Sequence, residues 1–215
     1  MPALYSKLLG HFGFLDWWPG ETKDEILIGA ILTQHTSWKN VEKSIYNLKR
    51  AKCISIDAIS SIGTKKLERL IRPSGFYKSK AKSIKSVSAY ILSKYGTING
   101  MHGRNTHSLR LELLGIHGIG KETSDSILLY AADKKIFVID AYTRRAIERI
   151  YGHGKGEGYE ALQSYIASQL PSSLRLYKDF HAQFVELCKN YCRTKPLCNK
   201  CPVKSYCKYY RSPSA

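Results

Sequence analysis

The chain has 215 residues, of which 43% are hydrophobic, and its 34 Lys and Arg against 17 Asp and Glu give a formal net charge of +17. That hydrophobic share can bury a sizeable core, which excludes a disordered chain and predicts one domain or two small lobes of one fold. The positive charge is spread along the whole chain and favours a polyanionic partner, nucleic acid first; a merely solubilising surface or an anionic membrane is the alternative.

The sequence also bears on the compartment. No run approaches the roughly eighteen apolar residues of a membrane span, and residues 1–10 lack the basic-then-apolar layout of a signal peptide. Five of the six cysteines lie between Cys188 and Cys207, a clustering typical of metal sites and not of secreted disulfide frameworks. We therefore expect an intracellular protein in a reducing compartment, with no membrane partner.

Along the chain, the first marked segment is Asp16-Trp17-Trp18-Pro19, and the remaining tryptophan is Trp38. Aromatic residues near a chain start can line a pocket, or they can simply pack an N-terminal helix onto the core. Beyond this segment, apolar residues recur at helical spacing and predict helices around residues 26–31, 41–48, 84–92 and 127–131. Breakers cut the chain into helices of ordinary length, and strand-like alternation is nearly absent. The sequence predicts an all-α fold.

Two further segments connect these helices. Basic, polar and aromatic residues interleave over residues 74–82, which could follow a phosphate backbone or form the solvated start of a helix. The run Lys135-Ile136-Phe137-Val138-Ile139 is short and β-branched. It could be an extended crossing or a helix end, and we interpret it as a link between two lobes.

The glycine-rich stretch from Gly115 to Lys121 is the strongest local signal. Its spacing nearly matches a nucleotide-binding P-loop, but Glu122 stands where Ser or Thr should hold magnesium, and the preceding segment resembles a helix end more than a strand. A helix-hairpin-helix around Gly118-Ile119-Gly120 fits better, since backbone N–H groups at a hairpin and a helix N-terminus suit a phosphate. A purely structural turn between helices is the alternative.

Asp140 follows the link, directly before a predicted helix that opens at Ala141. A partly desolvated carboxylate can stabilise a cationic transition state, whereas an Asp at this place can also serve only as a helix N-cap. Arg144 and Arg145 lie in the first turn of that helix, where the macrodipole does not favour cations. They face either phosphate or an acidic partner, or are simply exposed.

The last motif is a group of four cysteines separated by five, two and five residues: Cys192, Cys198, Cys201 and Cys207. Four thiolates in one loop can ligate a 4Fe-4S cluster or a tetrahedral zinc, and the spacing does not separate the two. Cys188 competes with Cys192 for the first position.

These motifs together resemble the endonuclease III superfamily of base-excision DNA glycosylases. The resemblance covers nearly the whole chain, and residues 27–36 and 75–81 are also similar to family motifs. It implies an all-α, two-lobed helix-hairpin-helix glycosylase fold with a C-terminal 4Fe-4S cluster loop. The central lobe would span 22–134, and the second lobe would combine 1–21 with 135–215; a cleft between them would hold a flipped base.

The resemblance also implies roles for individual residues. Asp140 would be catalytic, and Gly118, Ile119, Gly120 and Lys121 would grip the DNA backbone. Gln34 or His35 would fill the gap left by the flipped base. The 4Fe-4S cluster would be held by Cys192, Cys198, Cys201 and Cys207, although the first gap is one residue shorter than is usual in the family.

One departure bears on the chemistry. Strand-cutting members carry a Schiff-base lysine where this chain has Glu122, and a carboxylate cannot form an imine. We therefore expect a monofunctional glycosylase, and the pocket residues Trp17, Trp18, Trp38 and Glu122 resemble the 3-methyladenine branch. The alternatives are a bifunctional glycosylase and lyase for oxidised pyrimidines, which would use Lys121, and a non-catalytic iron-sulfur DNA-binding module. The partner would be damaged double-stranded DNA, bound by a monomer at the nucleoid.

Overall fold

The computed structural model describes residues 1–212, and over that range the chain forms helices and no β-strand. The expectation of an all-helical chain is thus confirmed. The chain divides into two compact units, one made of Met1–Trp18 with the segment that starts at Lys135, the other of Pro19–Lys134. We call these unit 1 and unit 2. The predicted lobes place their borders after residues 21 and 134, and residues 213–215 lie outside the described part of the chain.

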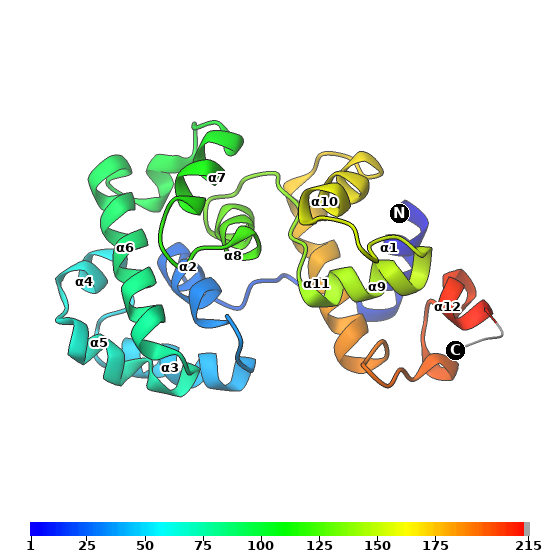
Figure 1. Ribbon diagram of the computed structural model, residues 1–215, viewed down its shortest axis with the longest axis horizontal. Helices are drawn as coiled ribbons and strands as arrows, with labels where there is room; N and C mark the ends of the chain where they lie inside the picture. The colour runs from blue at the N-terminus through cyan, green and yellow to red at the C-terminus, as the bar shows by residue number, and fades with distance from the viewer. Residues whose placement is uncertain (213–215) are drawn as a thin grey trace. The chain divides into compact units, whose positions relative to one another are not determined.

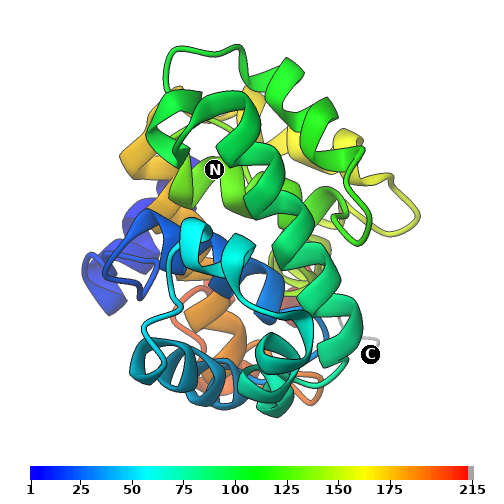
Figure 2. The same ribbon diagram turned by 90° about the vertical axis from the view of Figure 1, so that its left-hand side faces the viewer.

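Unit 2 is built around two helices, α2 and α6. Helix α2 begins at Lys23 because the Thr22 side chain accepts a hydrogen bond from the Glu25 N–H, and it is buried from Leu27 to Leu32. Helix α6 packs against α4 and α5, as Figure 2 shows for the long helix beside the cyan α4. The elements of unit 2 are α2 (Lys23–Leu32), α3 (Trp38–Arg50), α4 (Ile56–Ser61), α5 (Thr64–Leu70), η1 (Arg72–Ser74), α6 (Tyr77–Tyr95), η2 (Ile98–Met101), α7 (Thr106–Leu114), α8 (Lys121–Ser126) and η3 (Ile127–Ala131).

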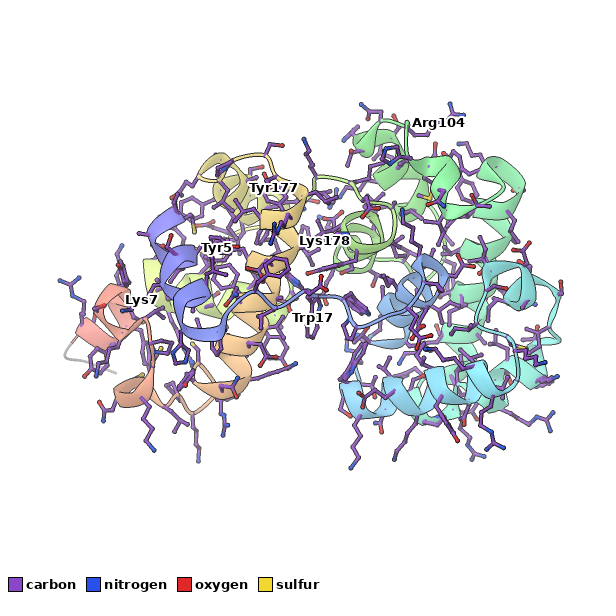
Figure 3. All side chains as sticks on the ribbon, turned by 180° about the vertical axis from the view of Figure 1, so that it is seen from behind. Tyr5, Lys7, Trp17, Arg104, Tyr177 and Lys178 are labelled. Atoms are coloured by element: carbon purple, nitrogen blue, oxygen red, sulfur yellow. The ribbon has the colours of Figure 1, made fainter. Side chains whose placement is uncertain are left out.

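Unit 1 is organised by α11, which has ten buried residues and therefore lies inside the unit over most of its circumference. Helices α1 and α9 pack on it (Figure 1). The Tyr5 hydroxyl on α1 donates a 2.8 Å hydrogen bond to Oδ2 of Asp179 on α11, and Figure 3 shows Tyr5 between these helices. The elements are α1 (Pro2–Phe12), α9 (Ala141–Tyr151), α10 (Tyr159–Ser168), α11 (Leu174–Asn190), η4 (Cys198–Lys200), η5 (Lys204–Tyr206) and α12 (Lys208–Arg211).

The predicted link is neither helix nor strand from Asp133 to Asp140, and Phe137, Val138 and Ile139 are buried. It carries the chain from unit 2 into unit 1 at Lys134 and Lys135. None of the helices in residues 1–212 combines the length and apolar character that a bilayer crossing requires.

Candidate functional site

The predicted helix-hairpin-helix is present in unit 2, where residues 115–120 join α7 to α8. Gly118 has φ +80°, and a Cβ built on it would lie 2.1 Å from Oγ of Ser83 on α6, so only glycine fits. Gly120 differs: its φ is −88° and nothing lies within 4 Å of a Cβ there. Ile119 is buried between them, whereas Lys121 is exposed. The fold therefore requires Gly118, while Gly120 leaves open space in front of the N-terminus of α8.

The loop after α2 is tied to this hairpin by Gln34. Its Nε2 donates to the carbonyl oxygen of Gly118 at 3.0 Å and to Oγ1 of Thr123 at 2.9 Å. The neighbouring His35 is exposed and left-handed, with φ 51°. The side chain of Gln34 is thus engaged within unit 2, and that of His35 is the more accessible of the two.

Phe76 was not among the residues predicted for the site. It is left-handed with φ 45°, its side chain is 71% exposed, and its ring centroid lies 6.2 Å from that of His35. An aromatic residue directly after Gly75 and before a lysine-rich helix start was the signal in the sequence that could have identified it. An exposed phenylalanine beside an exposed histidine forms an aromatic projection on unit 2.

The three predicted pocket tryptophans belong to two units. Trp17 and Trp18 are joined by a cis peptide bond in unit 1, with ring centroids 6.0 Å apart and edge to face. Trp17 lines a pocket that also includes Phe14 and Arg175, and the Arg175 guanidinium lies 4.5 Å from the Phe14 ring centroid. Figure 3 places Trp17 on the segment that follows α1. Trp38 is the first residue of α3, and Glu122 lies in the first turn of α8; both helices belong to unit 2.

Asp140 caps α9 and also faces a histidine. Its Oδ1 accepts a 2.6 Å hydrogen bond from the Thr143 N–H, and its Oδ2 lies 3.6 Å from Nε2 of His181. The Asp140 side chain is 14% exposed. Burial alone would raise the pKa of Asp140, but the His181 imidazole and the Thr143 N–H hold it below its ordinary value. The carboxylate is therefore kept anionic at neutral pH.

His181 gave no signal in the sequence, because it lies on the buried apolar surface of α11, where a histidine is usually only packed.

The structure also explains the two arginines of α9. Arg144 donates to the carbonyl oxygens of Gly154 and Glu157 at 2.9 and 3.0 Å, and Arg145 donates to that of Cys192 at 2.8 Å. Both brace loops of unit 1.

The four motif cysteines of the C-terminal loop line one pocket, together with Arg149. Nη1 of Arg149 lies 3.4 Å from Sγ of Cys192 and donates to the Arg193 carbonyl oxygen at 2.6 Å. A hydrogen bond with Cys188, followed by that from Arg149, lowers the pKa of Cys192. Cys188 itself is buried, and its thiol lies 3.3 Å from the Tyr142 carbonyl oxygen.

The arrangement of these cysteines can be compared with what a zinc ion and a 4Fe-4S cluster each require. Within residues 1–212, no group of three His, Cys, Asp or Glu side chains is arranged to hold a metal ion. A single tetrahedral zinc would need its thiolates close together, because each Zn–S bond is only about 2.3 Å long. A four-iron cluster holds each thiolate on a different iron, so its thiolates lie further apart. The four cysteines that line one pocket supply the thiolates that a four-iron cluster requires, one for each iron.

Comparisons with known proteins agree with this geometry. Residues 28–172 match the model of the HhH-GPD superfamily base excision DNA repair protein. A candidate DNA repair glycosylase of Methanocaldococcus jannaschii is 46% identical over 206 residues, which cover 95% of this chain and 94% of that protein.

Two solved structures are also similar. One is the Helicobacter pylori 3-methyladenine DNA glycosylase MagIII bound to 1,N6-ethenoadenine, with a TM-score of 0.73, 33% identity, and coverage of 86% of this chain and 94% of that one. The other is a non-covalent endonuclease III-DNA complex, with a TM-score of 0.81, 19% identity, and coverage of 98% and 94%. The second likeness concerns the fold alone.

Proposed function

The chain belongs to the HhH-GPD superfamily of base excision DNA repair proteins, and we propose that it is a monofunctional DNA glycosylase for alkylated purines such as 3-methyladenine. The observation that carries the proposal is the anionic Asp140, held by His181 and by the N-terminus of α9. As a monomer on duplex DNA, it would release the damaged base and leave the strand intact.

The chemistry follows from one carboxylate. A purine nucleotide alkylated at a ring nitrogen such as N3 is cationic, so its N-glycosidic bond breaks with the electron pair going to the base and needs no general acid. Positive charge then develops on the sugar, where the Asp140 carboxylate stabilises it and orients a water molecule toward C1′. The water oxygen bonds to C1′, and its proton passes to Asp140. A carboxylate kept anionic at neutral pH suits both roles.

Three observations support the substrate class. Trp17 and Trp18 offer aromatic faces in unit 1, and stacking with a cationic base adds roughly 0.5 to 2 kcal/mol as water is excluded. Trp38, at the start of α3, is a third candidate for stacking. The similar H. pylori protein is a 3-methyladenine DNA glycosylase.

The monofunctional mode is supported by Glu122, in the first turn of α8. It occupies the position where strand-cutting relatives carry the Schiff-base lysine, and its carboxylate cannot form an imine. Lys121 is adjacent, but one residue along a helix turns a side chain by about 100°. Lys121 and the open N-terminus of α8 at Gly120 are instead suited to a DNA phosphate.

The contacts in unit 2 separate the two candidates for the gap-filling residue. Gln34 is hydrogen bonded to Gly118 and Thr123, and it would have to break both bonds to enter the duplex. His35 is exposed and has Phe76 beside it. We propose His35 for the gap, with Gln34 joining the loop to the hairpin.

The C-terminal loop would hold a 4Fe-4S cluster through Cys192, Cys198, Cys201 and Cys207, which line one pocket. Bound there, the cluster would stabilise the structure of a loop rich in lysine. Hydrolysis of the N-glycosidic bond requires no electron from the cluster. Cluster binding has a direct readout: the purified protein should be yellow-brown and contain iron and acid-labile sulfide. A colourless, zinc-containing protein purified without oxygen would contradict this assignment.

Duplexes that each contain one methylated, oxidised or deaminated base test the function. We expect release of 3-methyladenine, no strand cleavage before alkali or heat, and no covalent complex on borohydride treatment. Asp140→Asn should retain DNA binding and lose base release. Strand cleavage with a trapped complex would establish the bifunctional alternative, and DNA binding without release of any base would establish the non-catalytic one.

A further inference from the structure

Lys80 is a fully buried lysine, with 2% of its surface exposed. It lies in the first turns of α6, and its Nζ donates to the carbonyl oxygens of Leu32 at 2.9 Å and Ser74 at 2.6 Å. Burial lowers the pKa of Lys80 to about 8. Removing an ammonium group from water is costly, so the two carbonyl contacts must compensate for it. We therefore ask what the two carbonyl contacts of this buried lysine hold together.

The two carbonyl groups belong to the segments that carry the aromatic projection. Leu32 is the last residue of α2 and precedes the loop with His35, whereas Ser74 is the last residue of η1 and precedes Phe76. Both His35 and Phe76 have left-handed backbones. Such conformations are unfavourable for residues other than glycine and persist only where the surroundings fix them.

We propose that Lys80 is a positioning residue that joins these two segments, so that His35 and Phe76 meet the DNA as one rigid surface when the duplex is distorted. This inference deepens the proposed function and rests on it. The Lys80 ammonium supplies a direct contact to both segments. Without it, each ring would move independently and would enter the duplex less often.

The same helix offers a matched control. Nζ of Lys85 donates to the carbonyl oxygens of Ile59, Ser60 and Ile62 at 3.0, 3.0 and 2.6 Å, all at the end of α4. Lys85 therefore has the same chemistry as Lys80, namely a lysine of α6 that binds backbone carbonyls. It contacts neither of the segments that carry His35 and Phe76.

The test uses the full-length protein with Asp140→Asn as background, and a duplex that carries 2-aminopurine next to the lesion. The fluorescence of 2-aminopurine rises when its neighbour unstacks, so it reports DNA distortion separately from base release. We expect Lys80→Met to slow or reduce this rise by about tenfold or more, because a displacement of about 1 Å at a reacting site has effects of that size. Lys85→Met should lower the melting temperature and leave the rise within twofold of the background protein.

Equal fluorescence signals for Lys80→Met and Lys85→Met would overturn the inference. If Lys80→Met does not fold, Lys80→Gln replaces it, since its amide can still donate to one carbonyl, and an intermediate signal is expected. Failure of the proposed function has a different signature: the wild-type protein would release no base from any lesion. A wild-type protein that releases 3-methyladenine, together with a full signal for the Lys80 variants, rejects only the role of Lys80.

Discussion

Nε2 of His181 lies 3.6 Å from Oδ2 of Asp140, while Oδ1 of the same carboxylate accepts the N–H of Thr143. One carboxylate oxygen therefore faces a side chain of α11, and the other accepts a hydrogen bond from the backbone of α9. Burial favours the neutral acid, and these two partners reverse that preference, so the pKa of Asp140 falls below its ordinary value.

Replacement of His181 should therefore change the pH dependence of base release. In His181→Asn, the pKa of Asp140 loses the larger of its two lowering influences, so the acid limb of the profile should move to higher pH. Single-turnover rates between pH 4 and 8 measure this shift. His11→Asn is the control, because His11 contacts Tyr191 elsewhere in unit 1. An unchanged acid limb in His181→Asn would separate the histidine from the carboxylate.

The same pair predicts a pH-dependent contribution to stability. The folded pKa of Asp140 lies below the unfolded value of about 3.9, so the anionic carboxylate stabilises the fold above that value. The contribution is lost as the pH falls through the folded pKa. Asp140→Asn keeps a good N-cap and removes the charge. We expect urea unfolding to show a lower stability for Asp140→Asn at pH 7 and a smaller difference at pH 3; an equal loss at both would exclude the charge as its cause.

The two hairpin glycines should respond differently to alanine. Gly118→Ala places a Cβ against Ser83 at φ +80° and should lower the free energy of unfolding by about 1–3 kcal/mol. Gly120→Ala meets no neighbour within 4 Å and should leave stability nearly unchanged. It should nevertheless weaken DNA binding, because the methyl group occupies the space in front of α8. Thermal unfolding and DNA titration distinguish them, and normal affinity for Gly120→Ala would exclude a phosphate there.

Glu122→Lys should introduce the Schiff-base chemistry that a monofunctional glycosylase lacks. A lysine in the first turn of α8 restores the amine of the strand-cutting relatives. With a substrate duplex and borohydride, this variant should form a covalent complex, whereas wild type and Lys121→Met should not. If wild type is trapped and Lys121→Met is not, Lys121 is a nucleophile and the enzyme is bifunctional.

Cluster ligation can be tested with two cysteine variants. Cys192→Ser removes a thiol of the loop, and Cys53→Ser removes a buried thiol in unit 2 outside the loop. Cys192→Ser should lose iron and the broad visible absorption at about 400 nm that is expected for iron-thiolate centres. The second should retain both. Cys188→Ser adds a further comparison, since loss of iron there would make Cys188 the first ligand.

The sequence predicted the helices well because burial follows local periodicity. Val41, Ile45 and Leu48 lie at helical spacing, and all three are buried on one side of α3. The hairpin was predicted for a similar reason, since the glycines mark it locally. Contacts between distant segments were beyond such reasoning. The pairing of His181 with Asp140 and the attachment of Gln34 to Gly118 depend on packing, and no local pattern indicates either.

For the arginines of α9, too, the contacts could not be inferred from the sequence. Their charge at a helix start suggested phosphate or an acidic partner, but Arg144 and Arg145 donate to backbone carbonyls of neighbouring loops. A carbonyl acceptor leaves no trace in side-chain composition, which is why this use of a basic residue is invisible in the sequence.

The close approach of Gly118 to Ser83 also restricts how this protein can evolve. With a Cβ at residue 118 only 2.1 Å from the Ser83 hydroxyl, the two positions share a volume that admits one small side chain. A family alignment should therefore show glycine at residue 118 wherever residue 83 is serine or larger. A lineage that acquires a side chain at residue 118 would have to remodel the hairpin or shorten the residue that faces it on α6.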